Sequence, residues 1–429
     1  MFNITNYNTV ALFIVLIINF TLISFYLKNK ITSIIDPLVY EILWLSSNIS
    51  FLLVFSFQYG FNPFSIIFLF SFFLYIFILK KQLISNNVRY FKKVKIVINK
   101  NKIFLVYVMS LALLLYSKVD LFIYMIENDF SHWFLYRFVD LQGRNPILRI
   151  INIGVVPVFL YISFLYIFFL KKYKFIISLL LIGYIILLLL GGGRSSLLSI
   201  IFAFGIFLIM HRNIYTKKEL SKINIYSSIF VFISILFIIV ISSMYKTDSV
   251  FMDGVNIFLN RVMANADGLE YYMRYNGYDN IQSGFFSYIM SFLGIYIKRI
   301  LDIDYINIGQ QLSELVVRHS LDFAQGSNYT LPLQVMVFGY YFYPIYVVLI
   351  SLVVIKMRNQ LISNSFSKNI RIYYLLSLSF GPIHDLEYFM LRIISCILIY
   401  FIFFYPILNI NYSLILSNPI KNNLNGAKK

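Results

Sequence analysis

The chain has 429 residues, of which 60% are hydrophobic and only 13% are charged, and its formal net charge is +18. Too few polar residues remain to cover the surface of a soluble protein, so the composition excludes a soluble domain and predicts a polytopic membrane protein. The basic excess is concentrated in short connections between apolar runs, which membrane orientation explains better than nucleic-acid binding does.

About eleven apolar runs predict about eleven membrane-spanning helices, because a bilayer needs roughly 20 apolar residues per helix and several runs meet or approach that length. None alternates as the strands of an outer-membrane barrel do. We therefore expect an all-α fold in which residues 1–429 form one transmembrane domain. In chain order the expected spans are residues 10–27, 38–57, 64–79, 103–116, 149–170, 175–190, 197–210, 227–244, 335–355, 372–380 and 392–410.

The connections between these runs fall into two sets of different charge. One set carries most of the lysines and arginines, and the other carries most of the acidic residues. The positive-inside rule assigns the basic set to the cytoplasm, so we expect the N-terminus outside, the C-terminus in the cytoplasm and any chemistry on the outer face. The basic set includes residues 80–102, 171–174, 212–222, 356–371 and the C-terminal tail.

Two expected outer segments are long enough to hold a site: residues 117–148 and residues 245–334. Within the longer one, residues 285–297 are apolar but too short to span, which is typical of a re-entrant or interfacial helix. Residues 309–324 have helical periodicity, and His319 lies on their apolar stripe. The longer segment therefore predicts structure packed on the ends of the spans.

A glycine-rich segment separates the runs 175–190 and 197–210. Its sequence is Gly191-Gly192-Gly193-Arg194-Ser195-Ser196. The glycines allow a sharp turn, and the first amides of the following helix, together with its dipole, favour an anion beside Arg194. The alternative is a plain glycine turn whose arginine extends into the lipid headgroups.

Two further segments carry groups that can handle a proton. In the helix 309–324, Arg318 and His319 accompany Glu314 and Asp322, and the alternative is an amphipathic helix whose charge row is self-satisfied. That helix would place an anion-binding group and a base at the membrane surface.

The second segment is Gly381-Pro382-Ile383-His384-Asp385-Leu386-Glu387. It follows the short run 372–380, which as a helix reaches only about 13 Å, so its ionisable groups are expected at or near membrane depth, where such groups are expensive and often functional. The alternative is a short outer loop in which Arg392 is the counter-ion.

Outer arginines are the remaining candidates, because the planar guanidinium suits bidentate binding of phosphate. Asp302 and Asp304 have a spacing that can hold a divalent metal, but solvated loop carboxylates explain two residues as well. No HExxH, Walker, GxSxG or CxxC motif occurs, and the single Cys396 cannot form an intrachain disulfide, so we expect no metal and no cofactor. The outer arginines are Arg137, Arg144, Arg149, Arg261 and Arg274.

In layout and in short motifs the chain resembles the bacterial O-antigen polymerases, also called oligosaccharide repeat-unit polymerases. The likeness lies in the glycine-rich segment 191–195, in Ser327-Asn328-Tyr329-Thr330 leading into Phe338-Gly339, and in a long outer loop before the last three spans. The resemblance implies a GT-C-like fold in the bacterial inner membrane and polymerisation of oligosaccharide units carried on undecaprenyl diphosphate at its periplasmic face. It also implies membrane lipids, a chain-length regulator and a flippase as partners, and no nucleic acid.

Such a transferase needs donors for the diphosphate and a base for the sugar hydroxyl. The base is expected to be His319, or else Asp385 or Glu387, and the outer aromatics Tyr271, Tyr272 and Tyr278, with Trp133, are candidates for stacking on sugars. A flippase of the same lipid-linked sugar, an O-antigen ligase and a non-catalytic scaffold remain as alternatives, although the long outer loop and the lack of a visible repeat favour an enzyme. The expected diphosphate ligands are Arg194, Gly192, Gly193, Ser195, Arg144, Arg149 and Arg318.

Overall fold

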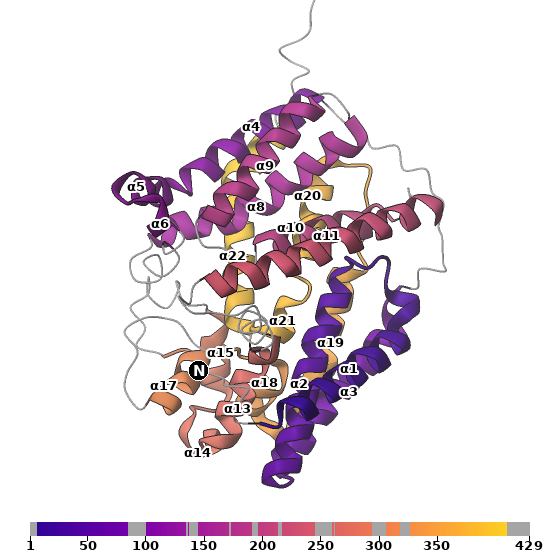
Figure 1. Ribbon diagram of the computed structural model, residues 1–429, viewed down its shortest axis with the longest axis vertical. Coiled ribbons are helices and arrows are strands. Elements are labelled where there is room, and N and C mark those ends of the chain that lie inside the picture. Colours follow the sequence, from indigo (N-terminus) through magenta and orange to yellow (C-terminus); the bar gives the residue numbers. More distant parts are fainter. Residues whose placement is uncertain are drawn as a thin grey trace, which may run out of the picture.

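The computed structural model describes residues 7–84, 100–133, 136, 145–170, 173–190, 196–212, 217–244, 260, 262–293, 306–317 and 327–409. Within these ranges the regular elements are helices and no strand occurs, which confirms the predicted all-α class (Figure 1). Some residues of the predicted sites lie outside the described ranges. They are Arg194, Gly192, Gly193, Ser195, Arg144, Arg318, His319, Arg137, Arg261, Asp302, Asp304 and Asp322.

The first half of the chain consists mainly of long apolar helices. Before four of them, a side chain in the polar connection accepts a hydrogen bond from a free amide of the first helical turn. In order the elements are α1 (Thr9–Leu27), η2 (Lys28–Lys30), α2 (Pro37–Tyr59), α3 (Pro63–Gln82), α4 (Lys100–Tyr116), α5 (Val119–Glu127), α6 (Phe130–Trp133), α8 (Pro146–Leu165), η3 (Tyr166–Leu170), α9 (Lys174–Leu190), α10 (Ser196–Met210) and α11 (Lys217–Met244).

The second half alternates between short helices and long ones. The short helices η4 to α17 gather beside one end of α2 and α3 (Figure 1). The elements are η4 (Ala264–Ala266), α13 (Asp267–Arg274), α14 (Gly277–Asn280), α15 (Phe285–Phe292), α17 (Ile308–Val317), α18 (Leu331–Gly339), η5 (Tyr340–Phe342), α19 (Tyr343–Arg358), α20 (Phe366–Leu378), α21 (Gly381–His384), α22 (Leu386–Ile399), η6 (Tyr400–Phe404) and α23 (Tyr405–Asn409).

Seven helical segments of the described residues are long and apolar enough to cross a membrane, and the bent pair α4–α5 makes an eighth if it counts as one span. The chain is therefore a multi-pass membrane protein. The difference from the expected count of about eleven comes from α9, α10 and α20, whose 17, 15 and 13 residues are short for a complete crossing. The seven segments are Thr9–Lys30, Pro37–Tyr59, Pro63–Gln82, Ile147–Leu170, Lys218–Leu236, Leu331–Arg358 and Leu386–Asn409.

Local sequence explains where several of these helices begin. Asp36, Asn62 and Asn145 each accept a hydrogen bond from a backbone amide in the first turn of the helix that follows, and each precedes a proline. An N-cap oxygen satisfies an amide that has no partner inside the helix, and proline at the first position gives up no hydrogen bond. α2, α3 and α8 therefore begin at residues 37, 63 and 146.

The expected span 335–355 lies within the helical segment Leu331–Arg358, in which the short turn η5 joins α18 to α19. The turn occurs at Gly339, whose φ of +134° other residues adopt only with strain. Two other boundaries also differ from expectation: α11 begins at Lys217 rather than at residue 227, and α22 begins at Leu386 rather than at Arg392. Helical structure is confirmed within the segments 285–297 and 309–324, as α15 and α17.

The helix ends form two chemically different faces. On the first, which we call the basic face, Lys30 donates to the carbonyl of Leu83, and Asn359 donates to that of Gln82 at 3.1 Å. The ends of α1, α3 and α19 therefore meet there. On the opposite end, which we call the loop face, Arg274 of α13 donates to the hydroxyl of Tyr59 at the end of α2, at 3.1 Å.

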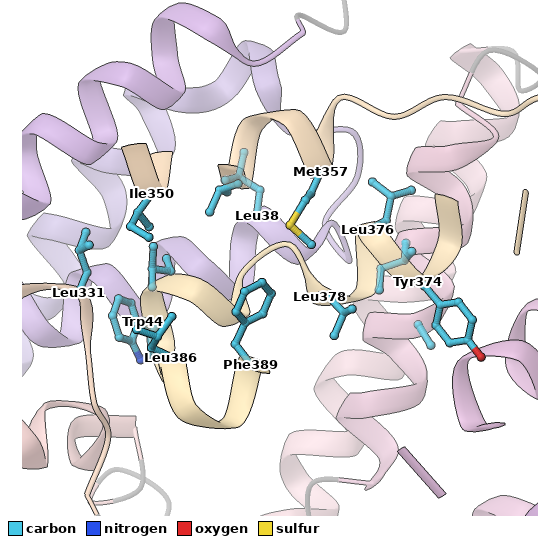
Figure 2. Close-up of a cluster of buried hydrophobic side chains, with 14 of the residues drawn as sticks. Leu38, Trp44, Leu331, Ile350, Met357, Tyr374, Leu376, Leu378, Leu386 and Phe389 are labelled. Atoms are coloured by element: carbon cyan, nitrogen blue, oxygen red, sulfur yellow. The ribbon is translucent and has the colours of Figure 1, made fainter. Parts of the chain in front are cut away.

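A buried apolar cluster joins α2 to the last helices of the chain (Figure 2). Trp44 of α2 is 2% exposed, and Leu386 and Phe389 of α22 belong to the same cluster. The bulky ring of Phe389 closes over Gly381, where an added Cβ would lie 2.5 Å from the ring. This close approach fixes the short helix α21 against the start of α22.

Candidate functional site

The short helix α21 lies inside the helix bundle. The imidazole of His384 stacks on the indole of Trp44 with ring centroids 4.3 Å apart, and Tyr40 lies 6.0 Å away. Trp44 is seven residues from the start of α2, or about 10 Å along its axis. The segment 381–387 therefore packs against α2 within the helix bundle.

A buried polar network holds α21 in place. Gln334 of α18 donates to the carbonyl of Pro382 at 2.8 Å and to that of Tyr329 at 2.9 Å. The hydroxyl of Tyr346 donates to the Gln334 side-chain oxygen at 2.8 Å, and Tyr288 donates to Tyr346 at 3.1 Å. A buried amide with its hydrogen bonds made is rigid, whereas an unpaired one is costly. The network therefore fixes α18, α19 and α21 relative to one another.

Glu387 is the buried carboxylate of this region. It is 4% exposed, lies in the first turn of α22 and accepts a hydrogen bond from the backbone amide of Ile308 at 3.3 Å. Ile308 begins α17, so the positive ends of two helix dipoles meet at this carboxylate and attract its negative charge. The contact joins the loop-face helix α17 to α22 across 79 residues of sequence.

Asp385, the other carboxylate of the predicted pair, has a defined structural role. It is the N-cap of α22 and accepts a hydrogen bond from the backbone amide of Tyr388 at 2.9 Å. This geometry satisfies an amide of the first helical turn.

Arg149 lies half-buried in the first turn of α8, a helix that packs closely along α22.

Another carboxylate, Asp267, binds the segment Ser327-Asn328-Tyr329-Thr330, on which part of the family resemblance rests. Asp267, at the start of α13, accepts hydrogen bonds from the backbone amide of Asn328 at 3.0 Å and from its side-chain amide at 3.1 Å. Gly268 lies so close that an added Cβ would be 2.3 Å from the Asn328 carbonyl. Burial raises the pKa of Asp267 to about 6, although these hydrogen bonds oppose the rise.

The N-terminal segment is tied to the same face. The hydroxyl of Tyr7 donates to Glu270 at 2.5 Å, and Arg274 forms an ion pair with Glu270 at 3.2 Å. Burial raises the pKa of Glu270, while the Tyr7 hydrogen bond and the Arg274 charge oppose the rise. Arg274, one of the outer arginines expected to bind phosphate, is thus already neutralised by a carboxylate.

Two of the four aromatic residues expected to stack on sugars are not available for it. Tyr271 and Tyr272 are buried in the core, and Tyr272 packs against Phe68. Tyr278 is half exposed and stacks on Phe64, whereas the indole of Trp133 donates to the Asn128 carbonyl. Helical periodicity could not have shown this, because five consecutive residues of α13, 268–272, are buried and together they cover all sides of the helix.

Sequence reasoning missed the buried charges near the basic face. Asp36 and Arg358 form an ion pair with side-chain exposures of 0% and 5%, and Tyr75 donates to the fully buried Glu41. The signal was present, because Glu41 interrupts an apolar span and ionisable groups inside spans are rare. Among the residues that the structure describes, no three His, Cys, Asp or Glu side chains are placed to hold a metal ion.

Comparison of the chain with protein-family models, with curated proteins and with solved structures found no match.

Proposed function

We propose that this protein is a membrane glycosyltransferase of the O-antigen polymerase type, which joins oligosaccharide repeat units carried on undecaprenyl diphosphate into a surface polysaccharide. Under this proposal the protein has a GT-C-like fold of about eleven spans in the bacterial inner membrane, with the loop face in the periplasm and the basic face in the cytoplasm. The N-terminus is then outside and the C-terminus inside. A flippase and a chain-length regulator are its proposed partners.

The observation that carries the proposal is Glu387, a buried carboxylate at the contact between α17 and α22. In the proposed reaction it accepts the proton of the acceptor hydroxyl while the hydroxyl oxygen forms a bond to the anomeric carbon of the donor sugar. The bond from that carbon to the diphosphate oxygen breaks, and the lipid diphosphate leaves with the electron pair. The predicted diphosphate ligands, led by Arg194, stabilise its charge. His319 is the alternative base.

A flippase and a ligase are the competing functions. A flippase moves the same lipid-linked sugar but makes no glycosidic bond, whereas a ligase uses the same donor with a different acceptor. Deleting the gene separates them on a gel of surface glycans. A single capped repeat without a ladder supports polymerisation, loss of even that repeat supports the flippase or ligase, and an unchanged ladder contradicts all three.

The residue-level test is Glu387→Gln. The glutamine oxygen still accepts the Ile308 amide bond, so α17 stays in place, but the amide cannot take up a proton. We expect the ladder to collapse to single repeats, with a loss of about 10²-fold or more in polymerisation rate for purified protein and lipid-linked donor. Asp279→Asn is the matched control, because it removes an exposed carboxylate from the same face. A Glu387→Gln variant with a normal ladder would assign Glu387 to positioning α17 and leave the base elsewhere.

A further inference from the structure

Arg392 is a cation inside a membrane-spanning segment. It is the seventh residue of α22, so it lies about 9 Å along the helix from Leu386, and the apolar segment continues to Asn409. A guanidinium is always charged at physiological pH, and a charge within a span is costly unless it meets a partner. The partners of Arg392 therefore decide what it does.

Among the described residues, the contacts of Arg392 leave its charge uncompensated. Its Nη2 donates to the carbonyl of Ser377 at 3.3 Å, and its Cζ lies 5.9 Å from the centroid of the Tyr388 ring. Among the described residues no carboxylate forms an ion pair with it, in contrast to the pairs that Arg358 and Arg274 make. A guanidinium carries five N–H donors, so one bond to a neutral carbonyl leaves most of them available.

Arg392 does not lie on the apolar exposed side of α22. Tyr388, one turn earlier, is 41% exposed, and Arg392 is half-buried. Farther along the helix the exposed positions are Ile397 and Leu398. At about 100° per residue, Tyr388 and Arg392 point in a direction roughly 150° away from that of Ile397 and Leu398. Arg392 therefore does not share the side on which α22 is exposed as an apolar surface.

A second polar group lies in α21, the helix that precedes α22. The buried Nε2 of His384 has no hydrogen-bond partner among the residues that the structure describes. A bound anion would be attracted by the arginine and would offer the imidazole nitrogen an acceptor. His384 is the last residue of α21, and Tyr388 and Arg392 lie in the first two turns of α22.

We propose that Arg392, together with Tyr388 and His384, forms a binding subsite for the phosphate group of a lipid. Phosphate fits because the planar guanidinium fork matches two of its oxygens, and a lipid fits because only a ligand with an apolar tail brings an anion to this position on a span. The same chemistry is offered by an ordinary anionic phospholipid and by a polyprenyl diphosphate. The identification of this lipid with the donor of the polymerase rests on the proposed function, whereas the phosphate subsite does not.

The test measures lipid binding to the full-length protein in phosphatidylcholine nanodiscs that contain either phosphatidylglycerol or undecaprenyl diphosphate, by native mass spectrometry. We expect Arg392→Gln to weaken binding of the preferred lipid by about tenfold or more, and Arg392→Lys, which keeps the charge but not the fork, to fall between. Arg371→Gln is the matched control, because Arg371 also lies over a tyrosine ring, that of Tyr400, but is exposed.

Each outcome has a defined meaning. Preference for undecaprenyl diphosphate that depends on Arg392 supports the subsite and its donor role. Preference for phosphatidylglycerol that depends on Arg392 supports the phosphate subsite and removes the donor role, whatever the glycan gel shows. If Arg392→Gln binds each lipid as tightly as the wild type does, the proposal is overturned, provided that the variant elutes as the same monodisperse species. If Arg392→Gln fails that criterion, Arg392→Lys decides, since unchanged affinity there overturns the requirement for a guanidinium.

Discussion

The ion pair between Asp36 and Arg358 should be one of the main stabilising contacts between α2 and α19. Asp36 is the N-cap of α2 and also accepts a hydrogen bond from the amide of Thr32 at 2.8 Å. Its partner Arg358 ends α19 and lies over the ring of Phe380, 4.8 Å from the centroid. Both side chains are buried, so neither charge has water as an alternative partner.

Removing one partner leaves a buried charge, which typically costs about 3–5 kcal/mol. For Arg358→Met we expect the lower end of that range, because the charge of Arg212 also acts on Asp36. Asp36→Asn keeps an oxygen for the N-cap but leaves Arg358 without its carboxylate. The double variant buries neither charge, so its loss should be smaller than the sum of the single losses by about 1–3 kcal/mol.

The assay is a double-mutant cycle on the free energy of unfolding, measured by titrating the purified protein in mixed micelles with dodecyl sulfate and following tryptophan fluorescence. Single losses that add to within about 0.5 kcal/mol in the double variant would refute the reasoning, because independent sites behave in this way. Single losses below about 1 kcal/mol would show that the pair is screened as a surface ion pair is.

Two further predictions concern packing and pH. Because burial raises the pKa of Asp267 to about 6, above the ordinary value of 3.8, ionisation of this carboxyl opposes folding increasingly as the pH rises from about 4 to about 6. Acidification from pH 7 to pH 5 should therefore strengthen the contact between Asp267 and Asn328 by about 1 kcal/mol and slow proteolysis between residues 262 and 293. Asp267→Asn should lose that pH dependence. An equal response of the wild type and the variant would count against Asp267 as the titrating group. Gly205→Ala should lower the free energy of unfolding by about 1–3 kcal/mol, because the added Cβ would lie 1.9 Å from the Ile35 carbonyl oxygen. Gly183→Ala should instead stabilise α9 by up to about 1 kcal/mol, because a Cβ there meets nothing within 4 Å. Equal melting temperatures for the two alanine variants would contradict the close approach.

The connection between α20 and α22 shows how far sequence reasoning reached at the candidate site. The short run 372–380 and the ionisable groups after it predicted an enclosed segment, and α21 does pack against Trp44 inside the bundle. The different roles of the two carboxylates, Asp385 and Glu387, could not be predicted. Whether a carboxylate caps its own helix, as Asp385 does, or meets another helix, as Glu387 does, depends on where α17 docks.

The sequence by itself determined the all-α class and the multi-pass character, because hydropathy and run length act locally and need no knowledge of neighbours. Only the tertiary structure decided that Glu41 meets Tyr75, that Tyr271 is buried, and that the N-terminal Tyr7 bonds to Glu270 across 263 residues of chain. These outcomes follow from which helix faces pack together, and a buried polar group finds its partner only after that packing has brought distant segments within hydrogen-bonding distance.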